Sequence, residues 1–408
     1  MSTKKKIMID IFLNNYIYIL VPLISGLIGY LTNVLSIKMT FYPLDFIGIK
    51  PFLGWQGILP SKAAKMAEKS VDLLTRDLFK PKEVFQKIDI KEFEKISRKD
   101  FLEMTDNITE QVMKIKMPIA WEIAGGGLKT KIKKSVADAL PEIVENSLKE
   151  IIDKIDQILD LKRLAVNTMK EDKAMINKIF LDLGGKQFRF IETSGFWLGI
   201  LFGIGQNITS FYTTHWLMFS LYGVFIGFIT NYLAIKLIFE PTEPKQFGPF
   251  KLWGLFLRNQ KEESFLYAKI IAEEVLTVEN LFDYIFRFPK NNVTNEIIFK
   301  HVSLAADKIL ETQPALFKFL ITNQKTSEFK SVIFFNLLNE LPLYIKGLYP
   351  YTGQALDIQN TIANKMSSLE PKQFIDFLRP AFQEDEWKLI AVGAALGGLA
   401  GFLQSLLV

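Results

Sequence analysis

One segment occurs twice in this 408-residue chain and constrains the fold more than any other feature. The first copy, SGLIGYLTNVLSIKMTFYP, spans residues 25–43, and the second, GVFIGFITNYLAIKLIFEP, spans residues 223–241. The threonine–asparagine pair, the lysine and the proline recur at a constant offset of 198 residues. A match repeated at a fixed distance indicates that one structural unit is used twice.

The same offset relates two glycine patterns of the form GxxxGxxxGxxQ, which end at Gln206 and Gln404. Together the matches predict two tandem copies of one unit, over residues 10–206 and 208–404. Small residues at this spacing let helices approach closely in lipid. The residues expected to pack helices in this way are Ser25, Gly29, Gly195, Gly199, Gly203, Gly223, Gly227, Gly393, Gly397 and Gly401.

Four stretches are expected to be transmembrane helices, in a chain that is 49% hydrophobic and 23% charged. A hydrocarbon core about 30 Å thick needs about 20 apolar residues. Residues 193–235 contain no Asp, Glu, Lys or Arg, which leaves room for two helices and a very short turn near 212–215. The predicted spans are residues 16–40, 193–210, 216–239 and 387–408.

The charged remainder forms two expected lobes of amphipathic helices, over residues 61–190 and 258–386. Apolar residues recur at helical spacing from Val144 to Leu159 and from Ile298 to Ile309. Pro141 precedes the first stripe, so we expect it near a helix start. The predicted fold is an all-α membrane protein of two parallel repeats, each with two transmembrane helices flanking one lobe.

Two short segments rich in Gly and Pro follow the duplicated helices, at residues 46–60 and 247–257. They are too short to span a bilayer, so we interpret them as interfacial or re-entrant segments. Lysines that reach the headgroups and tryptophans are typical interfacial anchors. The candidate anchors are Lys38, Trp55, Lys236 and Trp253.

An even number of spans per repeat gives both repeats the same orientation and puts both lobes on one side of the membrane. Lysines and arginines lie near the lobe-side helix ends, and by the positive-inside rule this predicts cytoplasmic lobes. Lys4, Lys5 and Lys6 lie on the opposite side and argue against that orientation. A bacterial inner membrane is the expected location.

The combined motifs resemble those of the YheB/YjiN-like family of bacterial membrane proteins. The residues that carry the resemblance are the duplicated segment, the sequence GWQGILP at 54–60, and FRFIETSG at 188–195 before the glycine pattern. The resemblance covers nearly the whole chain and implies an integral membrane protein, without implying a reaction. The second copy has GLFL at 254–257 in place of GILP, so a role of that loop need not be symmetric.

Catalytic, cofactor-binding and metal sites are not expected. The chain has no cysteine, and its histidines, His215 and His301, lie far apart outside any HExxH motif. GGGLKT at 125–130 lacks the spacing of a phosphate-binding loop and fits a turn. The basic run from Lys129 to Lys134 fits a solvated helix face, or contact with anionic headgroups.

The polar residues inside the predicted spans have two interpretations. Buried polar groups in lipid need partners, so they can simply hold the helices together. Alternatively they line a polar site or path on the axis that relates the repeats. The candidate residues for either role are Thr32, Asn33, Gln206, Thr230, Asn231 and Gln404.

Two functions follow from these patterns. The first is a non-enzymatic membrane protein whose lobes bind a lipid or a protein partner at the membrane surface. The second is a small transporter or channel built from the two repeats, with a polar path lined by the threonine–asparagine pairs. Membrane lipids are the expected partners, together with a homo-oligomer or another protein; no nucleic acid is expected.

Overall fold

The computed structural model describes residues 3–49, 53–62, 65, 68, 71–72, 74–210, 215–287, 292–312, 323–379 and 386–406. The predicted all-α class is confirmed, because helices dominate these residues and only two short hairpins interrupt them. The chain forms two compact units. Unit 1 comprises residues 1–73, 166–267 and 363–408, and unit 2 comprises residues 74–165 and 268–362.

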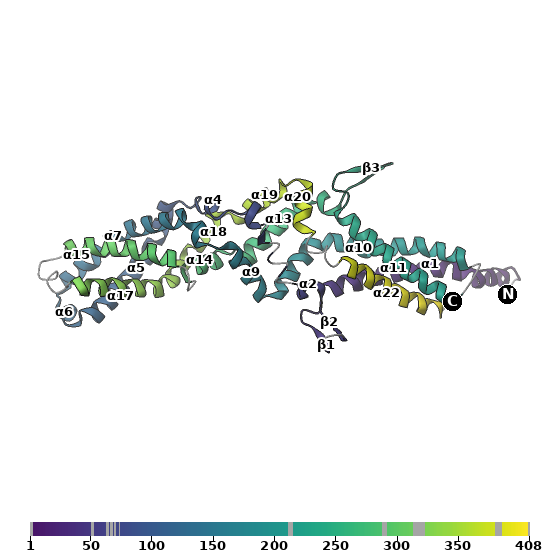
Figure 1. Cartoon of the computed structure of the whole chain (residues 1–408), viewed down its shortest axis with the longest axis horizontal. Helices are drawn as coiled ribbons and strands as arrows, with labels where there is room; N and C mark the ends of the chain where they lie inside the picture. The colour runs from purple at the N-terminus through teal and green to yellow at the C-terminus, as the bar shows by residue number, and fades with distance from the viewer. Residues whose placement is uncertain are drawn as a thin grey trace. The chain divides into compact units, whose positions relative to one another are not determined.

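Four long helices form the body of unit 1. They are α1 (Thr3–Phe41), α10 (Lys173–Ser210), α11 (Trp216–Phe239) and α22 (Glu386–Ser405). Helix α1 packs along α10 and α11 packs along α22, and the two pairs contact each other (Figure 1). The shorter helices wholly or mostly in unit 1 are α2 (Ile58–Ser61), α9 (Leu161–Glu171), α12 (Leu255–Arg258), α13 (Gln260–Ile270) and α20 (Pro371–Leu378), and α19 (Ile358–Ser367) is divided equally between the two units.

Glycine lets the paired helices touch through their backbones. A Cβ atom added to Gly29 of α1 would collide with the carbonyl oxygen of Gly195 of α10. In the other pair, a Cβ atom on Gly227 of α11 would collide with the carbonyl of Gly393 of α22. Successive contacts run in opposite directions along the two helices of a pair, so each pair is antiparallel. Small residues are required where the helices cross.

Unit 1 buries polar side chains and exposes apolar ones. Asn33 of α1 and Thr230 of α11 are completely buried, whereas large aliphatic and aromatic side chains cover the outer faces. Water would oppose this distribution, whereas a hydrocarbon solvent favours it. The exposed residues on these faces include Leu23, Leu27, Leu31, Trp197, Leu201, Leu221, Phe225, Phe228, Leu399 and Leu403.

Three helices of the described chain are long and apolar enough to cross a membrane, namely Ile19–Phe41, Trp216–Phe239 and Glu386–Ser405. The predicted fourth span, 193–210, is not among them, so the count of four stays a prediction. That segment carries Gln206 and Asn207, which lower its hydropathy. It is the continuation of α10, which begins twenty residues earlier, inside the stretch that we expected to belong to the lobe.

The two predicted interfacial segments contain hairpins that the sequence patterns did not predict. Strand β1 (Ile47–Ile49) pairs antiparallel with β2 (Leu53–Trp55), and β3 (Lys245–Phe247) pairs with β4 (Phe250–Leu252). Three-residue strands are too short to show alternation. Gly48, with φ of 135°, takes a backbone conformation that other residues avoid. Residues 50–52 of the first segment lie outside the described residues.

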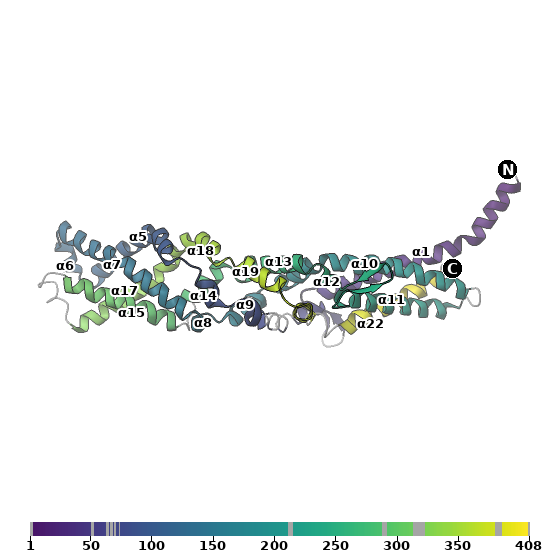
Figure 2. The ribbon, with the colours of Figure 1, turned by 90° about the horizontal axis from the view of Figure 1, so that it is seen from above.

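Unit 2 is built around four further long helices, α5 (Ile90–Lys116), α7 (Gly126–Asp153), α15 (Asn292–Thr312) and α17 (Asn323–Tyr344). They contact one another in a bundle, as Figure 2 also shows. The shorter elements of this unit are η1 (Leu74–Leu78), α4 (Pro81–Phe85), α6 (Pro118–Ile123), α8 (Ile155–Ile158), η2 (Ile271–Val275), α14 (Val278–Arg287), η3 (Ile345–Leu348) and α18 (Tyr349–Leu356).

The predicted apolar stripes form the inner faces of unit 2. Val144, Leu148 and Ile155 are buried, as are Ile298 and Val302 on α15. The expectation for Pro141 was wrong, because this proline lies inside α7 rather than near its start. Burial of Leu140 and Val144 on either side keeps the helix continuous, although proline cannot supply a backbone hydrogen bond.

The compact units do not coincide with the predicted tandem copies. Unit 1 takes helices from both copies, and so does unit 2. Within each unit, helices of one copy also pack against helices of the other, such as α10 against α11 and α7 against α15.

Bulk at the glycine crossing should destabilise unit 1. We expect Gly195→Leu to lower the thermal unfolding midpoint in detergent and the yield of monodisperse protein, because its side chain would meet the Gly29 carbonyl. The matched control is Gly205→Leu on the same helix, where a Cβ atom has no neighbour within 4 Å. Equal behaviour of the two variants in size-exclusion chromatography and thermal unfolding would contradict this account.

Candidate functional site

Unit 2 contains a partly open apolar cavity of about 200 Å³ between α5, α7, α15 and α17. Isoleucine, valine, leucine, methionine and phenylalanine side chains make most of its wall. Several wall residues, such as Ile333 and Leu337 of α17, are only half-buried. The lining includes Phe101, Met104, Ile108, Val112, Ile132, Val136, Ile143, Leu148, Ile298, Val302, Ala306, Ile309, Phe329 and Ile345.

The few polar side chains in this wall offer little to a polar ligand. The hydroxyl of Thr105 donates to the carbonyl of Leu102 at 3.0 Å, and that of Thr109 donates to Thr105 at 2.7 Å. The Lys330 ammonium pairs with Asp307 at 2.7 Å. Among the described residues, the buried Ser147 hydroxyl has no hydrogen-bond partner. The cavity therefore selects for hydrocarbon, because burying unpaired polar groups is costly.

Charged and polar contacts surround this apolar interior. An ion pair joins α15 to α7, with the Lys308 ammonium 2.7 Å from the Glu142 carboxylate. Helix α17 is tied to α5 by Gln111 and Glu340 at 2.8 Å. These contacts lie on exposed faces, where one pair contributes about 0–1 kcal/mol, so they orient the helices more than they stabilise them.

Glu150 makes the densest of these contacts. Its carboxylate accepts hydrogen bonds from Lys154 of α7 and Lys300 of α15, both at 2.9 Å, and lies 2.9 Å from the His301 ring. The hydrogen bond from Lys154, followed by those from Lys300 and His301, lowers the pKa of Glu150 from 4.5 to about 2. Glu150 thus holds α7 to α15 beside the cavity in its ionised form.

In unit 1 the predicted asparagines make equivalent hydrogen bonds. Asn33 of α1 donates to the Ile191 carbonyl of α10 at 2.7 Å, and Asn231 of α11 donates to the Leu389 carbonyl of α22 at 2.8 Å. Each asparagine lies where a Cβ atom on the facing glycine, Gly195 or Gly393, would collide with its amide nitrogen. The glycine is therefore what allows the asparagine to reach the backbone.

Both asparagines line one small cavity of about 40 Å³, together with Ser36 and Thr40. Among the described residues, the side-chain oxygens of Asn33 and Asn231 have no hydrogen-bond donor. The cavity exceeds the about 10–15 Å³ that one water needs, so it can hold a water molecule. A polar ligand there would lie beside two asparagines whose acceptors are unused.

The other predicted polar residues lie elsewhere. The hydroxyls of Thr32 and Thr230 donate to carbonyls of their own helices, at Gly29 and Ile226. The buried Ser25 hydroxyl donates to Gln206 at 3.1 Å. Gln404 is buried on α22, and neither glutamine lines the 40 Å³ cavity.

The predicted anchors differ between the two halves. Lys38 and Lys236 are exposed near the ends of α1 and α11, and Lys236 lies 5.7 Å from the ring centroid of Tyr232. Trp55 donates to the Met39 carbonyl at 3.1 Å. The buried indole nitrogen of Trp253 has no partner among the described residues. All ten predicted packing residues are buried.

Sequence reasoning located the helices around the apolar cavity but missed the cavity itself. The stripes on α7 and α15 indicate which faces turn inward. A void depends on how the volumes of facing side chains add up, and those side chains come from distant parts of the chain. The signal available in the sequence was the small pair Ala305 and Ala306 inside an otherwise large apolar stripe.

Comparison with known proteins points to membrane proteins. The chain is 24% identical over 183 residues to a UPF0754 membrane protein of Bacillus thuringiensis strain Al Hakam. It is 27% identical over 187 residues to a UPF0754 membrane protein of Bacillus cereus strain AH820 and to one of Bacillus anthracis strain A0248. These matches and the three apolar helices identify the chain as a membrane protein with distant relatives of that description.

Each match covers 41% of this chain and 45% of the relative, so the chain spans less than half the length of the curated relatives it matches. No family model matches the sequence. No solved structure matches it either. The relatives' names carry no reaction or ligand.

The asparagine contacts should contribute to the stability of unit 1. We expect Asn33→Ala and Asn231→Ala each to lower the free energy of unfolding by about 0.6–2 kcal/mol, because each removes one hydrogen bond between helices. Unfolding in a detergent titration measures this loss. The control is Ser220→Ala on α11, whose hydroxyl bonds only to its own helix. A folded double variant of unchanged stability that fails to restore a deletion phenotype would instead favour a polar path.

Glu150 should stabilise unit 2 in a pH-dependent way. Its folded pKa is depressed, so its contribution is present above pH 4.5 and is lost as the pH falls toward 2. We expect Glu150→Gln to lower the urea midpoint at neutral pH and to match the wild type near pH 2. Fluorescence of Trp121, the tryptophan of unit 2, follows this transition. A difference that is constant with pH would contradict the assignment.

Proposed function

We propose that the protein is a non-enzymatic integral membrane protein whose unit 2 binds the hydrocarbon part of a lipid. The observation that carries the proposal is the 200 Å³ apolar cavity within its four-helix bundle. An engineered apolar cavity of about 150 Å³ stays dry and binds small hydrocarbons, so one of this size and lining can hold part of an acyl chain. Each methylene taken from water contributes about 0.8 kcal/mol.

The cavity favours a lipid over a polar metabolite. Pockets for polar small molecules place a few converging polar groups among apolar walls. Here the hydroxyls of Thr105 and Thr109 bond to their own helix, and Lys330 is paired with Asp307. A membrane protein also has lipid available at high local concentration. Lipid handling is therefore the sharper form of the proposal, and a scaffold for a protein partner is its broader form.

The finer architecture belongs to the same proposal. We infer four membrane-spanning helices, since α10 also presents an apolar outer face at Trp197, Leu201 and Ile204. We infer two tandem copies, since the hydrogen bonds of Asn33 and Asn231 are related by the 198-residue offset at both donor and acceptor. We further propose that the chain is related to the YheB/YjiN-like family. Its proposed location is the bacterial inner membrane, with the lobes on the cytoplasmic side.

A second candidate function is a small transporter or channel. The observation that favours it is the 40 Å³ cavity, which Asn33 and Asn231 both line. Homo-oligomers would enlarge such a path. The tight glycine contacts around it leave little room for a solute, which is why lipid binding ranks first.

Filling the cavity should remove the lipid without unfolding the protein. We expect wild-type protein, gently extracted from native membranes, to retain a stoichiometric lipid that mass spectrometry detects. Ala306→Phe, which adds bulk to the cavity wall, should reduce that lipid at least about tenfold, a change of 1.4 kcal/mol. Its thermal midpoint should be equal or higher, because filled cavities stabilise.

The matched control is Leu304→Phe on the same helix, whose side chain is exposed and lies outside the cavity wall. It should retain the wild-type lipid. Lipid retained equally by Ala306→Phe and Leu304→Phe would place the lipid outside the cavity and refute the proposal. A co-purifying protein partner without bound lipid would favour the scaffold.

A further inference from the structure

One end of unit 2 exposes three large aliphatic side chains. Ile115 at the end of α5 is 62% exposed, and Ile119 and Ile123 of α6 are 73% and 78% exposed. They recur every four residues through the junction of the two helices. Leaving three isoleucines in water forfeits the hydrophobic gain that burial would give, and exposed apolar residues that recur in this way are typical of a contact surface.

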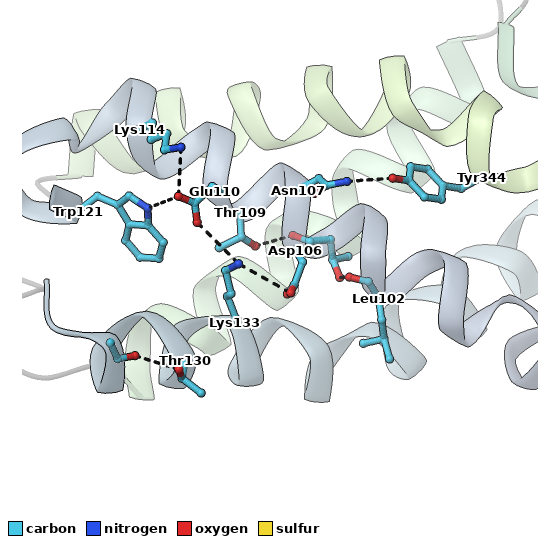
Figure 3. Close-up of polar contacts among 12 residues, drawn as sticks. Leu102, Asp106, Asn107, Thr109, Glu110, Lys114, Trp121, Thr130, Lys133 and Tyr344 are labelled. Carbon is cyan, nitrogen blue, oxygen red and sulfur yellow. Dashed lines mark hydrogen bonds and ion pairs between the residues drawn. The ribbon is translucent and has the colours of Figure 1, made fainter.

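The exposure is built into the fold. Trp121 of α6 is buried against Met113 and Ile132, and its indole nitrogen donates to Glu110 at 3.1 Å (Figure 3). Lys129 lies 5.3 Å from the centroid of the same ring. With Trp121 directed inward, the opposite face of this short helix must present Ile119 and Ile123 outward.

The same end carries a strong positive charge. Residues 114–134 contain six lysines and one glutamate. Lys114 and Lys133 pair with Glu110, and Lys116 pairs with Glu328. Lys131 and Lys134 are exposed and form no ion pair with any described residue. We call Ile115, Ile119 and Ile123, with Lys131 and Lys134, the α6 surface.

We propose that the α6 surface docks on an anionic lipid bilayer. Exposed aliphatic side chains within a lysine-rich segment match a membrane interface, where the apolar groups enter the acyl boundary and the cations meet the headgroups. Each lysine near an anionic surface strengthens binding about fivefold. A protein interface is a poorer match, because such interfaces are depleted in lysine and enriched in exposed aromatic residues and arginine.

The α6 surface also lies next to the cavity. Met113 and Ile132, which pack against Trp121 under α6, are part of the cavity wall. A lipid leaving a docked bilayer would reach the cavity past this cluster. This step rests on the proposed lipid binding, whereas docking itself is tested independently of whether the cavity is filled.

The test uses the full chain, which has no cysteine of its own. A single Ile119→Cys carries an environment-sensitive fluorophore in protein reconstituted into phosphatidylcholine nanodiscs. Vesicles containing phosphatidylglycerol are then added, and a second sample is reconstituted directly into phosphatidylglycerol nanodiscs. We expect a blue shift in at least one of these two conditions and none with phosphatidylcholine vesicles. The control is Leu343→Cys on α17, which is 70% exposed and should not shift.

The charge contribution is tested separately. In the labelled protein, Lys131→Gln combined with Lys134→Gln should weaken the response to anionic lipid about thirtyfold at low salt. The matched pair is Lys95→Gln of α5 with Lys149→Gln of α7, two exposed lysines away from this end, which should leave the response unchanged.

Three results would overturn the docking. The first is that the fluorophore at residue 119 shows no blue shift in either anionic condition. The second is an equal blue shift at residue 343. The third is that a photo-crosslinker at residue 119 captures a protein rather than lipid in native membranes. Lipid retention is measured in the same variants. If lipid retention persists while docking fails, the proposed function stands without the α6 surface. If docking persists while lipid retention fails, the α6 surface stands and the proposed lipid binding in the cavity does not.

Discussion

Backbone contact at glycine is the interaction on which unit 1 depends. Hydrocarbon tails are as apolar as the helices, so burial of apolar surface provides little net attraction between helices in a membrane. Close approach has to supply the binding energy through dispersion and through hydrogen bonds that hydrocarbon cannot replace. At Gly195 and Gly393 the missing side chain provides both, because it lets the helices touch and lets Asn33 and Asn231 reach a facing carbonyl.

Unit 2 follows the opposite principle. Its helices are held by apolar stripes on charged, solvated bodies, which is how helices pack in water. The inward-facing side chains, which include the small Ala305 and Ala306, do not fill the space between the four helices, and a 200 Å³ cavity remains. Void space costs stability, since each removed contact is lost outright. A protein that keeps such a void in an otherwise ordered bundle gains most if a hydrocarbon ligand occupies it.

The two units therefore offer different chemistry to the same lipid. The outer face of unit 1 is apolar along α1, α10, α11 and α22, as a bilayer requires. Unit 2 offers an apolar interior with ionic contacts around it, and a lysine-rich segment that exposes three isoleucines. The proposed contacts with lipid in the bilayer, in the cavity and at the α6 surface are separate, and each can be detected without the others.

The sequence by itself determined which segments are helical, which faces turn inward and which helices suit a membrane, because periodicity and hydropathy are local properties of the chain. It also placed Asn33 and Asn231 in equivalent positions. Only the tertiary structure decided that both asparagines line one cavity while Gln206 bonds to Ser25 instead, since these distances join helices far apart in the sequence. It also determined that unit 2 contains a cavity and that α6 exposes isoleucines, because voids and exposure depend on how all neighbouring side chains pack together.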